Sequence, residues 1–150
     1  MERTLILIKP DAVQRGLTGE LIARFERRGL QLIALKSLRV SVALAQQHYK
    51  EHAGKGFFQS LVDYITSCPI VALVLEGPKA VEIARMTIGA TDPVAATPGS
   101  IRGDYGVSIG RNLVHGSDSV ASAEREVKIF FSDAELLSYE RSSNRWIFEQ

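Results

Sequence analysis

Cysteine is almost absent from this sequence. Cys68 is the one cysteine among 150 residues, so a disulfide within the chain is excluded. A single thiol fits a reducing compartment, and we therefore expect a cytoplasmic protein. Because Cys68 is followed by Pro69 and an apolar run, we expect its thiol to lie in or near the core and to have no chemical role.

Long hydrophobic runs and an excess of one charge are also lacking. No segment approaches the ~18 consecutive apolar residues that a membrane span needs, and the first apolar run is too short for a signal peptide. Lys and Arg total 18 against 17 Asp and Glu, a net charge of +1. This balance argues against a broad basic surface for nucleic acid. We expect neither a membrane nor a specific nucleic acid as partner, and any anion site must be local.

The apolar pattern predicts an α/β fold in one domain, residues 1–150. Length and composition, with 45% hydrophobic and 23% charged residues, are ordinary for such a domain. Apolar runs predict strands at 3–9, 30–40, 69–76 and 127–131. Helical stripes, caps and glycine stops predict helices at 18–28, 41–52, 57–65, 78–88, 119–125 and 132–140. Four strands with helices between them favour a ferredoxin-like sandwich, although periodicity alone leaves a parallel, flavodoxin-like sheet open.

Residues 92–111 have no periodicity and form a long loop insertion before the last predicted strand. Loops of this length in compact domains are usually functional. The residues that follow place His115 within a run of glycines and small hydroxyl side chains. Arg102 and Arg111 can grip phosphate with a guanidinium fork, and Asn112 can both donate and accept hydrogen bonds, as recognition of a sugar hydroxyl demands. This density of functional groups favours a site over a surface turn.

Four segments together resemble the nucleoside diphosphate kinase family. They are Asn112-Leu-Val-His-Gly-Ser-Asp-Ser119, Arg102-Gly-Asp104, Ser122-Ala with Glu126, and Thr4-Leu-Ile-Leu-Ile-Lys-Pro-Asp11. The first is highly specific, and the resemblance covers essentially the whole chain. The departures are small: Ile129-Phe-Phe131 stands where the family more often has Leu-Trp-Phe, and Ile109 where valine is frequent. The resemblance implies an antiparallel sheet and a kinase that transfers the γ-phosphate of a nucleoside triphosphate to a nucleoside diphosphate.

The chemistry expected of such a kinase centres on His115. A neutral imidazole has one bare nitrogen and can attack phosphorus without a strong base, giving a ping-pong reaction through phosphohistidine. A carboxylate must hold the other nitrogen; Glu124 is near enough, but the S-A-x-x-E pattern selects Glu126. Ser117 is then expected to donate to that carboxylate or to the leaving oxygen. Mg²⁺ should ride on the substrate phosphates without direct protein ligands, with Asp118 in contact through water.

The resemblance assigns the remaining site residues to the nucleotide. It places Lys9 on the sugar and phosphates and Tyr49 in the nucleotide cleft, and it stacks Phe57 on the base at the cleft mouth, beside Leu61. It assigns further phosphate contacts to His52, Arg85, Thr91 and Arg102. It assigns a contact with the edge of the base to Ile109. It also implies a homo-oligomer. The long apolar C-terminal tail favours a hexamer, with a tetramer as the alternative.

Three other interpretations fit less well. His48-Tyr-Lys-Glu-His52 has the spacing of an inverted zinc protease motif, but no further metal ligand is evident, and His48 is taken as an ordinary polar residue. A serine hydrolase would need a G-x-S-x-G elbow, which is missing. An RNA-binding module would need an RNP1 pattern, which is also missing. The sequence therefore predicts phosphoryl transfer rather than hydrolysis or RNA binding.

Overall fold

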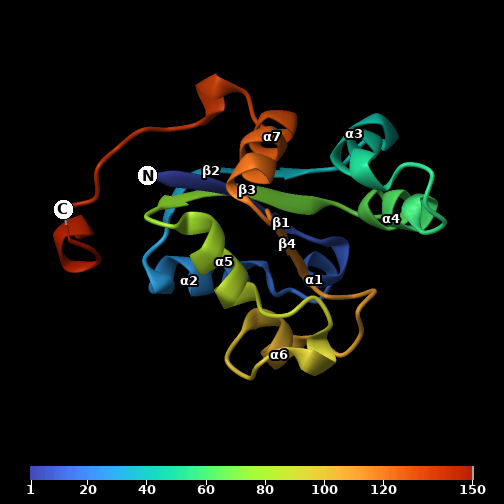
Figure 1. Cartoon of the computed structure of the whole chain (residues 1–150), viewed down its shortest axis with the longest axis horizontal. Helices are drawn as coiled ribbons and strands as arrows, with labels where there is room; N and C mark the ends of the chain where they lie inside the picture. Colours follow the sequence, from blue (N-terminus) through green and yellow to red (C-terminus); the bar gives the residue numbers. More distant parts are fainter. Residues whose placement is uncertain (150) are drawn as a thin grey trace.

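An antiparallel sheet forms the centre of the computed structural model, which describes residues 1–149. The sheet contains β1 (Glu2–Ile8), β2 (Gln31–Leu38), β3 (Ile70–Gly77) and β4 (Val114–Gly116), in the order β2-β3-β1-β4 (Figure 1). Every neighbouring pair of strands is antiparallel. The predicted ferredoxin-like sheet is thus confirmed and the parallel alternative is excluded.

Helices cover both faces of the sheet, and this arrangement explains why the strands are continuous apolar runs. In β1, Leu5 and Leu7 face one core while Ile6 and Ile8 face the other, and all four are fully buried. The first core is closed by α3 (Val42–His48), α4 (Phe58–Ile65) and α7 (Val120–Phe130). The second is closed by α1 (Pro10–Gln14), α2 (Thr18–Arg28), α5 (Ala80–Ile88) and α6 (Ile101–Tyr105). A strand buried on both faces cannot alternate polar and apolar residues.

The predicted fourth strand at 127–131 is wrong. These residues continue α7, in which Ala123, Glu126, Val127 and Phe130 form one buried face at helical spacing. Ser119 caps the helix, because its hydroxyl accepts from the backbone N–H of Ser122. The actual fourth strand, β4, is only three residues long and lies within the glycine-rich stretch, where no apolar run marks it. The sheet therefore carries the predicted nucleophile directly.

Several predicted boundaries also shift. The helix predicted over 41–52 starts as expected at the Ser41 cap but ends at His48, and a 3₁₀ turn, η1 (Lys50–His52), follows. The helix predicted over 132–140 is only η3 (Asp133–Glu135), although its predicted capping box is formed. The excursion between α5 and β4 is not structureless, because it contains η2 (Pro93–Ala95) and α6. Arg24 of α2 ties this excursion to the body through a 2.6 Å ion pair with Asp104.

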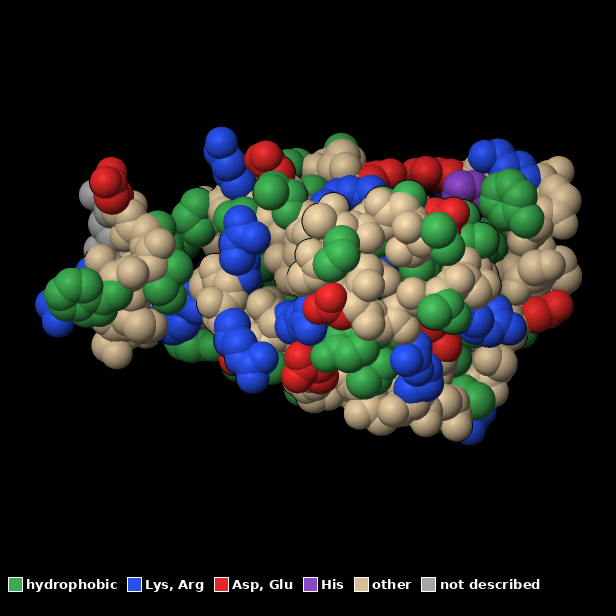
Figure 2. Space-filling model, turned by 90° about the horizontal axis from the view of Figure 1, so that it is seen from below, with side chains coloured by type: hydrophobic (Ala, Val, Ile, Leu, Met, Phe, Trp, Pro, Cys, Tyr) green, Lys and Arg blue, Asp and Glu red, His purple; other side chains and the backbone are tan. Residues whose placement is uncertain are grey.

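The C-terminal segment runs past β2 and ends as an arm on one side of the molecule, with η4 (Asn144–Trp146) near its tip (Figures 1 and 2). Its attachment is polar at Arg141, which donates to the Gly29 carbonyl at 2.8 Å, and apolar at Ile147, which packs over Gly29. Trp146 is 79% exposed. Basic and acidic side chains are interspersed on the face shown in Figure 2. Among residues 1–149, no helix combines the length and apolarity that crossing a bilayer requires.

Candidate active site

His115 lies at the middle of β4, opposite Leu7 of β1. The chain enters this strand through Leu113, which has a φ of 75° although it is not glycine. Asp11 braces the turn, because its Oδ2 accepts from the Leu113 N–H at 3.0 Å, and Lys9 N–H donates to the Leu113 carbonyl at 2.9 Å. A left-handed non-glycine residue costs about 1–3 kcal/mol and persists only where its surroundings hold it. The backbone beside His115 is therefore fixed from outside the strand.

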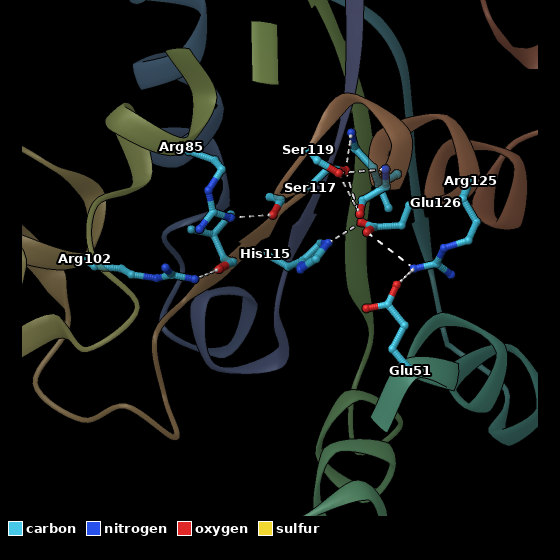
Figure 3. A network of polar contacts seen from close by, with 12 residues as sticks. Glu51, Arg85, Arg102, His115, Ser117, Ser119, Arg125 and Glu126 are labelled. Atoms are coloured by element: carbon cyan, nitrogen blue, oxygen red, sulfur yellow. Dashed lines mark hydrogen bonds and ion pairs between the residues drawn. The ribbon is translucent and has the colours of Figure 1, made fainter. Parts of the chain in front are cut away.

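The ring of His115 is held from one side by Glu126. The distance from His115 Nε2 to Glu126 Oε1 is 2.6 Å, and the Ser117 hydroxyl donates to the same oxygen at 3.1 Å (Figure 3). Ser117 is fully buried and Glu126 nearly so, whereas the imidazole keeps 26% of its side chain exposed. With the carboxylate accepting from Nε2–H, the lone pair of the neutral ring lies on Nδ1. Two alternative contacts are predicted for the Ser117 hydroxyl, one with this carboxylate and one with the leaving oxygen. The structure has the contact with the carboxylate.

Two arginines satisfy the open edge of β4 on either side of His115. Arg102 Nη2 donates to the Val114 carbonyl at 2.6 Å, and Arg85 Nη1 donates to the Gly116 carbonyl at 3.3 Å. In Figure 3 both guanidinium groups lie on the side of His115 opposite Glu126. Arg102 is buried and also donates to the carbonyls of Asn112 and Gly89. Since a guanidinium has five N–H groups, two remain on Arg102 for an anion.

Lys9 brings a third cation to the same place from the end of β1. Its Nζ donates to Asn112 Oδ1, and Asn112 Nδ2 donates to the Thr91 carbonyl at 3.0 Å. Burial, and then the neighbouring Arg102, lower the pKa of Lys9 to about 8. Burial and Arg85 likewise lower the pKa of Arg102 to about 10. Cations crowded into a partly desolvated site without enough carboxylates raise one another's free energy, and a bound anion relieves this cost.

These groups line one cavity of about 340 Å³. Ten of the predicted site residues form its wall together with Asp118: Lys9, Tyr49, His52, Leu61, Arg85, Thr91, Arg102, Asn112, His115 and Glu126. They come from segments between residues 9 and 126 that are far apart in the chain, so the cavity exists only in the folded protein. A second and wider hollow of about 820 Å³ shares Arg85 and Asp118 with it but does not include His115.

Three predicted residues lie outside the wall of this cavity. Ser117 is behind Glu126, and Phe57 and Ile109 are exposed, at 49% and 60%. Phe57 lies beside His52, with 5.2 Å between ring centroids. Arg111 also departs from the expected phosphate grip: its guanidinium stacks 4.4 Å from the centroid of Tyr64, whose hydroxyl donates to Asp11. Arg111 thus supports the brace of Leu113 instead of the cavity.

The cavity wall also contains Tyr49 at the end of α3. Burial, and then the nearby Glu126, raise the pKa of Tyr49 to about 12. Its hydroxyl is therefore protonated across the physiological range and can donate to a substrate oxygen. His52 of η1 lies one turn further along, so the boundary between α3 and η1 presents both rings to the cavity.

His48, Arg125 and Glu51 also line the cavity. The expectation that His48 is an ordinary polar residue is wrong, because its ring is buried beside His115, and the sequence does not single out Arg125 or Glu51. His48 is 5% exposed, and its ring meets that of His115 edge-on, with 4.8 Å between the ring centroids. The sequence offers one sign that His48 faces inward: it follows Ala45, the other buried residue of α3, by one helical turn. Arg125 Nη2 lies 3.8 Å from Glu126 Oε2 and 3.4 Å from Glu51 Oε1 (Figure 3). Glu51 and Arg125 are far apart in sequence, and no local pattern connects them.

The residues present fit a Mg²⁺ ion that is carried by the substrate. Asp118 is the carboxylate of the cavity wall beside Arg85, and its pKa is lowered by a hydrogen bond from Ser122 and by the charge of Arg85. Glu126 is occupied by His115 and Ser117, and Glu51 is paired with Arg125. One ionised carboxylate suits Mg²⁺, which usually keeps several waters and takes few protein ligands.

Fold and site together define an α/β protein with a carboxylate-oriented imidazole at the base of a cationic cavity. A family model for nucleoside diphosphate kinase matches residues 2–136. The nucleoside diphosphate kinase of Pelotomaculum thermopropionicum is 58% identical over 149 residues, covering 99% of this chain and 100% of the relative. That of Archaeoglobus fulgidus is 53% identical over 150 residues, covering 100% of this chain and 99% of the relative. This chain belongs to the nucleoside diphosphate kinase family.

Solved structures agree with this assignment. The nucleoside diphosphate kinase of Halobacterium salinarum in complex with CDP superimposes with a TM-score of 0.96 at 47% identity, covering 99% of both chains. The family protein of Babesia bovis gives 0.96 at 46% identity, covering 99% of this chain and 100% of the other. Both cover the sheet and the excursion between α5 and β4, so the likeness extends over the whole fold.

Proposed function

We propose that this chain transfers the γ-phosphate of a nucleoside triphosphate to a nucleoside diphosphate in two steps through His115. The observation that carries the proposal is the placement of the imidazole, with Nε2 on Glu126 at 2.6 Å and the other edge toward a cavity rimmed by Lys9, Arg85 and Arg102. Phosphoryl transfer requires in-line positioning and cations around the equatorial oxygens. This cavity supplies both from fixed side chains.

In the first step, Nδ1 of His115 attacks the γ-phosphorus, and the bond from that phosphorus to its bridging oxygen breaks. The nucleoside diphosphate leaves with the bonding electrons. Positive charge grows on the ring, and the Nε2–H bond to Glu126 stabilises it. The second step reverses these events with a different diphosphate as acceptor. When bound to the phosphates, Mg²⁺ supplies charge neutralisation, and Asp118 is the residue that would contact it through water.

The remaining assignments rest on the cavity wall and on the family resemblance. Lys9 contacts the sugar and the phosphates. His52, Arg85, Thr91 and Arg102 contact phosphates, Asn112 contacts the sugar, and Tyr49 donates to a substrate oxygen. Phe57, Leu61 and Ile109 form the mouth for the base, where stacking accepts any base because every base has a π-face. We further infer that residues 1–150 act as one domain in the cytoplasm.

A labelling experiment tests the nucleophile. Brief incubation with γ-labelled ATP and Mg²⁺ should give an acid-labile, base-stable label on the protein, which any added nucleoside diphosphate removes. His115→Ala should abolish the label. In His52→Gln, a matched loss of an imidazole from the same cavity, the label should still form on His115. Label retained in His115→Ala, or an acid-stable label on the wild type, would refute the assignment.

Self-association is part of the proposal. Leu137, Trp146 and Ile147 of the C-terminal segment are 59%, 79% and 42% exposed, and exposed large apolar side chains can mark contact surfaces. We propose a homo-oligomer in which this segment is covered, a hexamer in preference to a tetramer. Light scattering gives the mass directly, and a monomer at micromolar concentration would contradict the proposal.

A further inference from the structure

Three metal-ligating side chains converge at the base of the cavity. One ligand atom each from His48, His115 and Glu126 lies within 4.8 Å of the other two. The three residues come from α3, β4 and α7, so no sequence motif joins them. Two imidazoles and one carboxylate form a donor set that Zn²⁺ takes in proteins, with a fourth position left open to water.

The phosphoryl-transfer chemistry gives His48 no task. Its side chain is 5% exposed and is enclosed by the rings of Tyr49, His115 and Phe130, with centroids 4.7, 4.8 and 5.3 Å away. Within the described residues, His48 Nδ1 is buried and has no hydrogen-bond partner. A buried polar atom without a partner costs about 1–3 kcal/mol. The fold thus keeps an imidazole with unused coordination capacity beside the predicted nucleophile.

We propose that His48, His115 and Glu126 form an inhibitory site for one Zn²⁺ ion or another borderline-soft divalent ion. Tetrahedral bonds of about 2.0–2.1 Å separate neighbouring ligand atoms by about 3.3 Å. The 2.6 Å contact between His115 and Glu126 must therefore open slightly, and the His48 ring must approach, because the three ligand atoms now lie up to 4.8 Å apart. The ion takes the place of the proton between His115 and Glu126. Two neutral imidazoles and one carboxylate leave a single net positive charge on the complex, and water in the cavity can fill the fourth position.

Inhibition follows from the tautomer of His115, and this part of the inference rests on the proposed function. An ion on Nε2 leaves Nδ1 as the one ring nitrogen that can hold a proton. The proton displaced from Nε2 moves through water to Nδ1, so the ring remains neutral. Nδ1 then has no lone pair with which to attack phosphorus. In the free enzyme, Glu126 accepts from Nε2–H and so leaves the lone pair on Nδ1. In the metal complex, Glu126 is a ligand of the ion whose binding leaves Nδ1 protonated.

The site should discriminate against the cation of the reaction itself. Mg²⁺ prefers oxygen ligands in octahedral geometry and gives up its waters reluctantly, whereas imidazole favours Zn²⁺, Cu²⁺ and Ni²⁺. Two of the three donors here are nitrogens. Millimolar Mg²⁺ therefore neither fills the site nor protects it, and a much lower concentration of free Zn²⁺ inhibits.

Co²⁺ without nucleotide is the direct probe, because it substitutes for Zn²⁺ and reports tetrahedral nitrogen ligation by visible absorption. We expect one ion per chain, displaced by Zn²⁺. His48→Phe keeps an aromatic ring in place but removes the ligand, and should weaken binding at least about tenfold. The chain offers two matched controls: His52→Gln and Cys68→Ser remove the other histidine and the one thiol, and both should bind Co²⁺ as the wild type does.

Imidazole nitrogen NMR of the wild-type protein keeps the test independent of any variant's folding. Zn²⁺ should shift the ring nitrogens of His48 and His115 and leave those of His52 in place. Labelling by Mg-ATP at buffered free Zn²⁺ then measures inhibition, which a zinc-selective chelator should reverse. Absence of 1:1 binding, binding unchanged in His48→Phe, or binding lost in His52→Gln or Cys68→Ser would overturn the site. If the metal binds as expected but labelling by Mg-ATP is undiminished, the inhibitory role is overturned. If the metal binds as expected but no label forms even without Zn²⁺, the proposed function is refuted while the metal site stands.

Discussion

The charge on Lys9 should limit the enzyme in mildly alkaline solution. Burial and the adjacent Arg102 lower the pKa of this lysine to about 8, and Asp11 offsets the shift only in part. At pH 9 about one-tenth of the free enzyme would still carry the ammonium charge. Because kcat/KM reports ionisations of the free enzyme, we expect it to fall about tenfold between pH 7.5 and pH 9.

The direction follows from the sign of the shift. The protonated lysine attracts phosphate, so activity is present below the pKa and is lost as the pH rises through it. Bound phosphates favour the ammonium form and raise the pKa in the complex. The maximal rate kcat should therefore decline at a higher pH than kcat/KM does. A merely structural lysine would not separate the two profiles.

Lys9→Arg provides the matched control, because a guanidinium remains charged at pH 9. Its absolute activity should be lower, since a planar fork cannot reproduce the Lys9 bond to Asn112, but the fall between pH 7.5 and pH 9 should disappear. Adenine nucleotides are the substrates to use, because adenine does not lose a proton in this range. A flat wild-type profile, or the same fall in Lys9→Arg, would refute the reasoning.

Three further predictions concern other parts of the molecule. Glu126→Gln replaces a charge-assisted hydrogen bond worth about 1.5–3 kcal/mol and should slow phosphorylation roughly 10- to 150-fold; rapid-quench labelling at wild-type speed would contradict this. Burial lowers the pKa of His48 to about 2 from 6.5, so its neutral form stabilises the fold above pH 6.5, and this stability is lost as the pH falls toward 2. In urea unfolding with EDTA, His48→Phe should reduce the loss between pH 7.5 and pH 4.5 by about 2–3 kcal/mol; an unchanged loss would exclude His48 as its source. A Cβ on Gly103 would lie 2.1 Å from the Thr97 carbonyl oxygen, so Gly103→Ala should destabilise by about 1–3 kcal/mol, whereas Gly19→Ala meets nothing within 4 Å and should stabilise slightly; equal midpoints for the two variants would argue against the clash.

Local chemistry made much of the fold predictable. The sequence predicts the 18–28 helix to the residue, because its apolar stripe and the Gly29 stop are local signals. The strand predicted at 127–131 is wrong because Val127 and Phe130 suit a strand and a buried helix face equally well. Ala123 and Glu126 are buried on the same face as Val127 and Phe130. This pattern, visible only in the structure, has the period of a helix and not the two-residue period of a strand.

The amino-acid sequence alone determines the family, the apolar strands of the core and the histidine with its predicted chemical partners, because each rests on residue identity or on short-range spacing. Tertiary structure alone decides that β4 carries His115 at the sheet edge, that Arg85 and Arg102 hold the carbonyls beside it, and that His48 adjoins the ring. These relations join residues distant in the chain. Hydrogen bonds and ring contacts depend on separation in space, which only packing sets.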